Sequence, residues 1–445
     1  MKKETKAFPV LYPNACGIDI SSKEHYVAVN PLMDPKPVRA FGAFTEDLYA
    51  IAQWLKQCKV ETVAMEATGI YWVSLFLVLE EEGFEVILVN AKHVKNVRGK
   101  KTDVKDAEWI RQLHSCGLLS ASFQPDGFTR QLRTYMRHRK NLLEMAATHI
   151  RMMHKALEQM NVKLQHVISD ITGKSGQAII KAIIDGDTNP DTLISHLDRR
   201  IKASHEEVKK SLKGIWKKEH LFELKQSYEM YHSYNDKIKE CDKEIEMLLR
   251  QHPASGQPDK QMPGKAKPKS NKNNVSFDAS SILYAITGQD LTAIYGINDS
   301  NALEILSEIG FDMGKWPTAK HFTSWLNLAP NNKISGAKVL SSKTQKKKNK
   351  AGLIFRLAAY AIQRSKNHLA SFFQRIKAKH GAPKAITATA RKLAVIFYKM
   401  LKDNVPFNPP SIEEYNQSIR EKQIQGLTKK AHKLGLKLQI LEVVS

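Results

Sequence analysis

The sequence is poor in cysteine and contains no closely paired thiols. Its 445 residues include four cysteines, at Cys16, Cys58, Cys116 and Cys241. None belongs to a CxxC pair and the spacings fit no zinc motif, which argues against a disulfide framework or a zinc-stabilised fold. We therefore expect reduced, buried thiols in a cytoplasmic protein.

Long apolar stretches are also absent. No apolar run reaches the roughly 20 residues that a membrane-spanning helix requires. The first residues, MKKETKAFPVLYP, carry lysines without an apolar segment after them, so they do not match a signal peptide. No membrane contact is expected.

Acidic residues are few in comparison with basic ones. Lysine and arginine number 69 against 45 aspartate and glutamate residues, which gives a formal net charge of +24. Such an excess repels itself unless a polyanion is near, and nucleic acid is the default partner because each neutralised phosphate releases counterions. The hydrophobic fraction of 42% and the chain length indicate a folded protein of two or three domains.

Strand and helix patterns alternate in the first third of the chain. Short β-prone runs at residues 15–20, 25–29 and 38–44 predict an antiparallel meander. Periodicity then predicts, in the order helix, strand, helix, strand, helix, elements at 46–57, 62–65, 70–82, 84–89 and 103–113. This order is that of an α/β, RNase H-like domain over residues 1–127, although other mixed α/β folds share it.

The middle of the chain, residues 128–250, has a heptad pattern that predicts a helical coiled-coil region. The first seam steps by four and three through Leu132, Met136, Arg139, Leu143, Ala146, Ile150, Met153, Leu157, Met160 and Leu164. A second seam follows through Leu221, Leu224, Tyr228, Tyr231, Ile238, Ile245 and Leu249. Asn235 and Asp242 interrupt it. The seams can close on each other or on a second subunit.

The composition changes after residue 250. Residues 251–279 begin with a stretch rich in Pro, Lys, Gly and Asn, which predicts a flexible basic linker. A mostly helical domain is expected at 280–410, and it carries the lysine-rich run SSKTQKKKNK at 341–350. The basic tail at 411–445 has no assigned function.

Four acids of the first domain form a pattern typical of metal chemistry. Asp19 and Glu66 each interrupt an apolar strand, where a carboxylate is costly unless it is paired or binds a cation. Asp103 and Asp106 are three residues apart, so a helix would present both on one face. Taken singly, Asp103 suits a helix N-terminus, Asp106 a surface and Asp19 a turn. Together they predict a site for Mg²⁺, with Mn²⁺ as a substitute.

Long motifs in both halves of the chain resemble the DEDD-type insertion-sequence transposases, a family that includes the Piv invertase. In the first third these are GIDISSKEH, VAMEATGIYW, VNAKHVKNVRGKKTDVKDAEW and HSCGLL. Later ones are HIRMMHKALEQMN, VISDITG, IYGINDSNALEILSEIG, WPTAKHFTSWLNLAP, NNKISGAKVLSSKT and GAPKAITATARKLA. The resemblance implies a RuvC-like catalytic domain whose metal-binding tetrad is Asp19, Glu66, Asp103 and Asp106.

The resemblance also implies a nucleophilic serine in the C-terminal domain. The family's Ser-Gly-Gly-Lys stretch matches residues 335–338, so Ser335 would form a phosphoserine link to DNA, with Ala337 in place of the second glycine. Ser341 and Ser342 are rival candidates. No histidine or acid lies beside Ser335 in sequence, and a lone serine in a lysine-rich loop is usually a turn residue or a phosphate contact. The family precedent is an active site composed between subunits of a dimer or tetramer.

Several residues are candidates for contacts with nucleic acid. The segment around Gly296 resembles a helix-hairpin-helix, although an ordinary helical hairpin fits equally well. Phosphate contacts are expected from Lys338 and from the lysines of the run at 341–350, namely Lys343, Lys346, Lys347, Lys348 and Lys350. The resemblance implies that a structured non-coding guide RNA directs the enzyme in the prokaryotic cytosol or nucleoid. The sequence has no RNP aromatic signature or KH loop that would identify an RNA-binding module.

The leading interpretation is therefore a transposase that cuts and rejoins DNA through a phosphoserine intermediate. One alternative is a RuvC-like Mg²⁺-dependent endonuclease, such as a junction resolvase, which would use water and would not need Ser335. Another is a non-catalytic nucleic-acid-binding protein that keeps the fold. The presence of all four acids argues against the latter.

Overall fold

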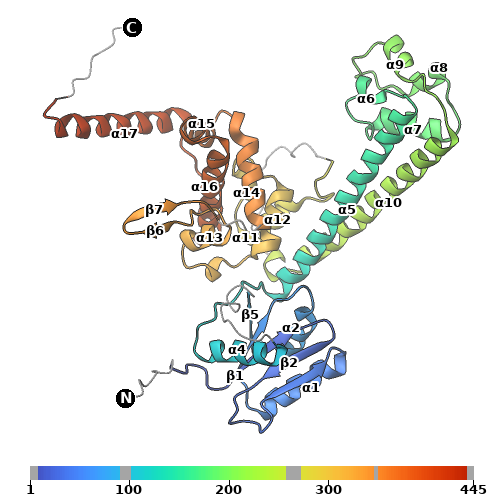
Figure 1. Cartoon of the computed structure of the whole chain (residues 1–445). Coiled ribbons are helices and arrows are strands. Elements are labelled where there is room, and N and C mark those ends of the chain that lie inside the picture. The colour runs from blue at the N-terminus through green and yellow to red at the C-terminus, as the bar shows by residue number, and fades with distance from the viewer. Residues whose placement is uncertain (1–8, 91–101, 257–271, 345–348, 438–445) are drawn as a thin grey trace. The chain divides into compact units, whose positions relative to one another are not determined.

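The computed structural model describes residues 9–90, 102–256, 272–344 and 349–437 (Figure 1). Contacts between residues divide the chain into two compact units, Met1–Gln124 and Pro125–Ser445. Each unit is described by itself below. Across the described ranges, no helix combines the length and the apolar character needed to cross a membrane.

A mixed five-stranded sheet forms the first unit. Its strands are β1 (Ala15–Ile20), β2 (Glu24–Ala28), β3 (Val38–Gly42), β4 (Thr62–Glu66) and β5 (Glu85–Val89), arranged in the order β3-β2-β1-β4-β5. The pairs β1–β2 and β2–β3 are antiparallel, and the pairs β1–β4 and β4–β5 are parallel. The predicted meander and the two later strands are confirmed, with ends within a few residues of those expected.

Helices cover both faces of this sheet. Helices α1 (Thr45–Gln57) and α2 (Trp72–Glu81) pack on the face that carries the main apolar core, which includes Ile18, Val27, Met65, Ile51, Leu55, Leu75 and Leu79. Helix α4 (Asp103–Ser115) covers the other face, where Ile110 packs with Ala64 and Val89. A carboxylate on the α4 face therefore lies outside the main core.

Helix α4 approaches β1 at Gly17. A Cβ atom on this glycine would lie 2.2 Å from the backbone nitrogen of Arg111 and 2.5 Å from the carbonyl oxygen of Ala107. Because no side chain fits in that space, the backbone of the helix rests directly on the strand. The contact fixes the start of α4 beside the end of β1, which is where the sequence predicts a metal site.

The far end of α4 is fixed by a buried histidine. His114 is 4% exposed, and its Nε2 lies 3.0 Å from the Oγ1 of Thr62 at the start of β4. The backbone N–H groups of Leu11 and Tyr12 donate to the carbonyl of Ser115. The ring of Tyr12 stacks on His114. These contacts tie the helix to the sheet and to the segment before β1.

The burial of His114 should make the first unit sensitive to acid. Burial lowers the pKa of His114 from 6.5 to about 4, so between these values the unfolded chain binds a proton that the folded chain does not. The free energy of unfolding is therefore highest above pH 6.5. It falls as the pH drops towards 4, by at most about 3 kcal/mol, because protonation of His114 favours the unfolded chain. Hydrogen exchange of α4 at pH 7, 5.5 and 4.5, corrected for intrinsic rates, measures this loss.

The control for this prediction is an exposed histidine. His114→Gln should flatten the pH dependence of α4 opening, whereas His205→Gln, at an exposed position, should leave it unchanged. Equal pH dependence in the His114→Gln variant and the wild type would refute the assignment.

Two long helices form a hairpin at the start of the second unit. Helices α5 (Gly127–Gln159) and α10 (Lys218–Arg250), 33 residues each, run antiparallel, as the stacking of His149 on Tyr234 and the pairing of Arg139 with Asp242 require. The buried seams face each other within one chain. Leu142 is buried in place of the predicted Leu143, and the first helix ends at Gln159, earlier than the heptad pattern suggests.

Short helices connect α5 to α10 at the far end of the hairpin. They are α6 (Leu164–Val167), α7 (Lys174–Ile184), α8 (Pro190–Leu193), η1 (Ile194–His196) and α9 (His205–Ser211). Their apolar residues, among them Ile179, Ile180, Ile183, Leu193 and Val208, are buried. They close the open end of the hairpin with a small core.

A buried ion pair occupies the polar interruption in the seam. Arg139 and Asp242 are 5% and 1% exposed, and Arg139 Nε donates to Asp242 Oδ1 at 2.5 Å. Arg139 also donates to the carbonyls of Asn273 and Asn274, and the N–H of Ser276 donates to Asp242 Oδ2. The end of the predicted linker is thus held against the hairpin, while residues 257–271 lie outside the described ranges.

The rest of the second unit is mostly helical, as predicted. Its elements are η2 (Pro253–Gly256), α11 (Ala279–Thr287), η3 (Leu291–Ala293), α12 (Asp299–Ile309), η4 (Met313–Lys315), α13 (Ala319–Trp325), β6 (Lys333–Ser335), β7 (Lys338–Ser341), α14 (Lys350–Ala361), η5 (Ile362–Arg364), α15 (His368–His380), α16 (Ala382–Lys402) and α17 (Ile412–Lys433). The predicted basic tail thus contains a helix, α17, in which no residue is buried.

Ion pairs fix the base of the hairpin to α12. Arg137 donates to both carboxylate oxygens of Glu308, at 2.9 and 2.8 Å, and Lys140 pairs with Glu304 at 3.0 Å. Arg133 donates to the backbone carbonyl of Glu308 at 2.6 Å. Such bidentate contacts fix direction as well as distance. These contacts join the base of the hairpin to α12 within the second unit.

Candidate functional site

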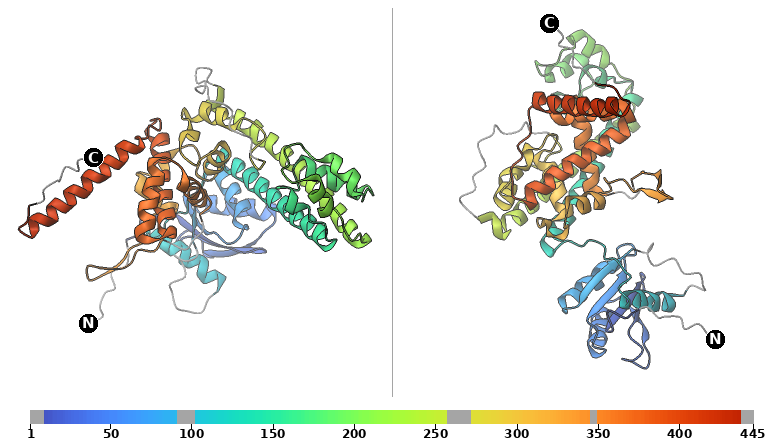
Figure 2. Two further views of the ribbon diagram at one scale, coloured as in Figure 1. Left: turned by 90° about the horizontal axis from the view of Figure 1, so that it is seen from above. Right: turned by 90° about the vertical axis from the view of Figure 1, so that its left-hand side faces the viewer.

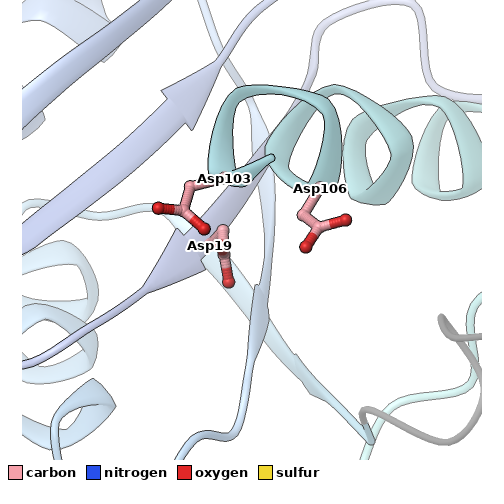
Figure 3. Close-up of side chains that lie close together, drawn as sticks. All are labelled: Asp19, Asp103 and Asp106. Atoms are coloured by element: carbon pink, nitrogen blue, oxygen red, sulfur yellow. The ribbon is translucent and has the colours of Figure 1, made fainter. Parts of the chain in front are cut away.

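Three of the four predicted acids converge at one end of the sheet (Figure 3). Asp19 belongs to β1, and Asp103 and Asp106 lie in the first turn of α4. One carboxylate oxygen from each lies within 4.8 Å of the others. The close contact of α4 with Gly17 explains why residues 84 or more positions apart in the chain meet here.

The start of α4 suits this concentration of negative charge. Thr102 caps the helix, because its Oγ1 accepts a hydrogen bond from the N–H of Lys105. The unpaired N–H groups and the dipole of a helix N-terminus stabilise acids in the first turn. Three neighbouring carboxylates still repel one another, and a cation that binds all three removes that repulsion.

The charge of the cluster extends to the neighbouring strand. Tyr26 of β2 pairs directly with Asp19 across the antiparallel ladder. A hydrogen bond from its hydroxyl to Glu24 raises the pKa of Tyr26, and the charge of Asp103 raises it further. The end of the sheet is therefore a region of negative potential in a strongly basic protein.

The fourth acid, Glu66, lies next to the cluster but is not part of it. Glu66 is the last residue of β4. The parallel register aligns Ile18 with Met65, so the residues that follow them, Asp19 and Glu66, lie beside each other on adjacent strands, on the face that α4 covers. Its Oε1 accepts a hydrogen bond from the hydroxyl of Thr68 at 3.3 Å. Glu66 thus lies on the correct strand end and face for a fourth ligand.

The donor set of the cluster fits a divalent cation. It consists of carboxylate oxygens alone, which are the hard ligands that Mg²⁺, Ca²⁺ and Mn²⁺ prefer, and it has no thiolate or imidazole that would favour zinc. Asp19, Asp103 and Asp106 would hold such an ion. The free cysteines Cys16, Cys58 and Cys241 are buried, as predicted, and Cys116 is half-buried.

The candidate nucleophile Ser335 belongs to the second unit. It is the last residue of β6, in a hairpin with β7 that projects from the helices (Figure 2). The turn residues Gly336 and Ala337 have φ angles of +50° and +62°. This left-handed conformation costs an alanine roughly 1–2 kcal/mol, so Ala337 stands where a glycine would be relaxed. Ser335 is exposed, and so is the rival Ser342.

The predicted nucleic-acid contacts occupy different environments. Lys338 lies in β7 and Lys343 just beyond it, both exposed, whereas Lys346, Lys347 and Lys348 lie outside the described residues. Lys350 is also exposed at the surface, but desolvation and the charge of Arg137 lower its pKa, so this lysine is close to the ion pairs at the hairpin base. Gly296 has a φ of +79°, and a Cβ there would lie 2.8 Å from the carbonyl of Ala358. Packing against α14 explains this glycine.

The comparisons with known proteins agree with the geometry. Residues 16–162 match a transposase family model, the DEDD transposases of the IS110 type, and residues 288–374 match the transposase IS116/IS110/IS902 family. The first match contains the acid cluster and the second contains Ser335. No curated protein matches the chain. On these two matches the chain belongs to the IS110 family of DEDD transposases, enzymes that cleave and rejoin DNA.

Proposed function

We propose that this transposase cuts and rejoins DNA with Mg²⁺ bound at Asp19, Glu66, Asp103 and Asp106 and with Ser335 as the nucleophile. The observation that carries the proposal is the convergence of three carboxylates at the junction of β1 and α4. The strand order of the first unit is in keeping with the RNase H-like fold that a DEDD domain implies. A bound divalent cation would stabilise the charge that develops on the phosphodiester and its leaving oxygen.

The chemistry assigned to Ser335 is an exchange of phosphodiester bonds. The serine Oγ attacks phosphorus, an Oγ–P bond forms, and the bond from phosphorus to the leaving sugar oxygen breaks. The hydroxyl proton passes to a general base and the leaving oxygen takes up a proton. Because the phosphate stays esterified, a second sugar hydroxyl can reverse the step and join a new strand without an external energy source.

We further propose that the reacting site is composed of parts from an oligomer. Ser335 pairs with Lys338 in the β6–β7 ladder, but its exposed hydroxyl has no hydrogen-bond partner among the described residues, so we place its general base elsewhere in the assembly. The family precedent of a dimer or tetramer supplies that source. We include in this proposal that α5 and α10 act as a coiled coil. We also include a guide RNA, which the family resemblance implies.

A covalent adduct tests the serine mechanism. Purified protein, Mg²⁺, the junction DNA of the element and the RNA that co-purifies are incubated and resolved on a denaturing gel. A DNA-linked protein band is expected for the wild type and for Ser342→Ala, a matched change at the neighbouring exposed serine, and no band for Ser335→Ala. Ribonuclease treatment before DNA is added should also abolish the band if RNA guides the reaction.

The opposite result would favour the hydrolytic alternative. Nicked DNA without an adduct, together with full cleavage by Ser335→Ala, would show that water is the nucleophile and that the enzyme acts as a RuvC-like endonuclease. Loss of DNA binding in a variant that lacks the acids is not expected, because phosphate contacts come from basic residues.

A further inference from the structure

An open groove lies between the end of the β6–β7 hairpin and the helices α15 and α16. Its volume is about 1390 Å³. One wall is the end of β7 with the residues that follow it, and the other is formed by α15 and α16. All of these elements belong to the second unit. We call this feature the α16 groove.

The lining of the α16 groove is cationic. It includes Lys343, Lys384, Arg391 and Lys392, with His368 and His380, and none of its lining residues is acidic. Within the described part of the chain, none of the four lysines and arginines forms an ion pair, in contrast to Arg137 and Lys140 at the hairpin base. Charges that the protein leaves uncompensated in a concave site favour an anionic ligand.

Further cations surround this wall. Partial burial lowers the pKa of Lys392, and the charges of Arg375 on α15 and Lys422 on α17 lower it further. Arg375 also lies 5.8 Å from the ring centre of Tyr415 and donates to its hydroxyl. Positive charge from three helices thus accumulates on one side of the groove, and a polyanion would relieve it.

The lining of the groove also has apolar and aromatic residues. Val339, Leu340, Phe372, Val395 and Ile396 line it, and the ammonium group of Lys392 lies 4.3 Å from the centre of the Phe372 ring. A nucleic-acid duplex keeps the faces of its bases stacked inside, so they cannot stack on such a surface. A single strand offers both bases, which stack on apolar and aromatic groups, and phosphates, which bind cations.

A buried histidine supplies an unused polar atom in the same lining. His368 is 8% exposed, and its Nδ1 is buried without a hydrogen-bond partner among the described residues. Buried polar atoms are rarely left unpaired, because the lost hydrogen bond to water is costly. His368 therefore adds a polar group to this part of the groove lining.

We propose that the α16 groove binds a single-stranded segment of nucleic acid, with its phosphates on Lys384, Arg391 and Lys392 and its bases on the apolar lining around Phe372. The binding itself requires neither the acid cluster nor Ser335. Its place in the reaction rests on the proposed function: β7 leads from the turn after Ser335 to the groove, so a strand joined to Ser335 would continue into it.

Fluorescence anisotropy with the full-length protein tests this proposal. The probes are an unstructured labelled 12-nucleotide DNA, the matching RNA and the matching duplex. The variant Lys384→Gln/Arg391→Gln/Lys392→Gln should bind the single strand at least about tenfold more weakly. The slope of the logarithm of the binding constant against the logarithm of the salt concentration should become shallower by about 2, since each lost phosphate contact contributes about 0.7 to that slope. The control Lys429→Gln/Lys430→Gln/Lys433→Gln removes equal charge from the exposed helix α17.

A second variant separates base contacts from general electrostatics. Phe372→Ala should weaken single-strand binding by about fivefold or more and leave duplex binding unchanged, provided that its melting temperature matches the wild type. Weakening of the DNA probe alone would identify a DNA strand as the occupant, and weakening of the RNA probe alone would identify the guide. Unchanged single-strand affinity in the groove variant, or equal losses in the groove variant and the α17 control, would overturn the proposal. Ser335→Ala should bind like the wild type, so failure of the serine mechanism would leave this result intact.

Discussion

Replacing Asp19 by asparagine is expected to slow DNA cleavage by about three orders of magnitude without lowering the melting temperature of the protein. Asp19 is the acid of β1 that meets both acids of α4, and on the proposed function its loss would remove a metal ligand worth several kcal/mol in transition-state stabilisation. The fold should not suffer, because the substitution removes one charge from a cluster of like charges. Single-turnover cleavage of junction DNA and thermal unfolding measure the two effects.

Two further measurements make this prediction specific to metal binding. Millimolar Mg²⁺ or Mn²⁺ should raise the melting temperature of the wild type, because an ion that binds only the folded state stabilises it by mass action, and should have no such effect on Asp19→Asn. Glu24→Gln, a change of an exposed acid on the adjacent strand, should retain cleavage and the metal response. Wild-type cleavage by Asp19→Asn would remove the acid cluster from the mechanism.

Asp242→Ala should destabilise the second unit by about 3–5 kcal/mol. The variant leaves the Arg139 guanidinium buried without its carboxylate partner and also removes the acceptor of the Ser276 N–H. A buried unpaired charge is the more expensive of these two losses. Urea unfolding followed by the helical circular dichroism signal measures the change in unfolding free energy.

A nearby surface acid provides the comparison for Asp242. Glu240, two residues away on α10, pairs with Lys237 on the exposed side of the helix, and Glu240→Ala should cost less than about 1 kcal/mol. The double change Arg139→Met/Asp242→Leu should recover much of the stability, because apolar groups of similar volume need no partner. A cost below about 1 kcal/mol for Asp242→Ala would show that the pair is dispensable for folding.

The sheet and the acid cluster could be predicted from the sequence because both depend on local pattern. The apolar runs that end at Ile20 and Met65 identify buried strands, and the acids at their ends stand out against them. The spacing of Asp103 and Asp106 gives one helix face without knowledge of the fold. The prediction that these acids form one cluster therefore required only that the start of α4 lie beside the end of β1, which the order of the elements suggests.

Features that depend on distant pairing could not be predicted. In the heptad pattern Arg139 counts only as a long aliphatic side chain and Asp242 only as an interruption. The sequence does not show that these two residues, 103 positions apart, face each other. Leu142 is buried in place of Leu143, although the later seam residues Ala146, Met153 and Leu157 are buried as predicted, and the heptad pattern alone does not show this shift. The cations of α16 were not singled out, since their groove exists only when β7 packs near that helix.

The contact at Gly17 affects how the surroundings of the acid cluster can change over generations. The separation between β1 and α4 is set at this point by two main chains in contact, whose thickness is the same whatever side chains surround them. Substitutions elsewhere in the core can thus accumulate without moving Asp19 relative to Asp103 and Asp106. The tolerance has one exception, since even a methyl group at position 17 would push the acids apart. A residue without a side chain therefore insulates the acid cluster from drift in its surroundings.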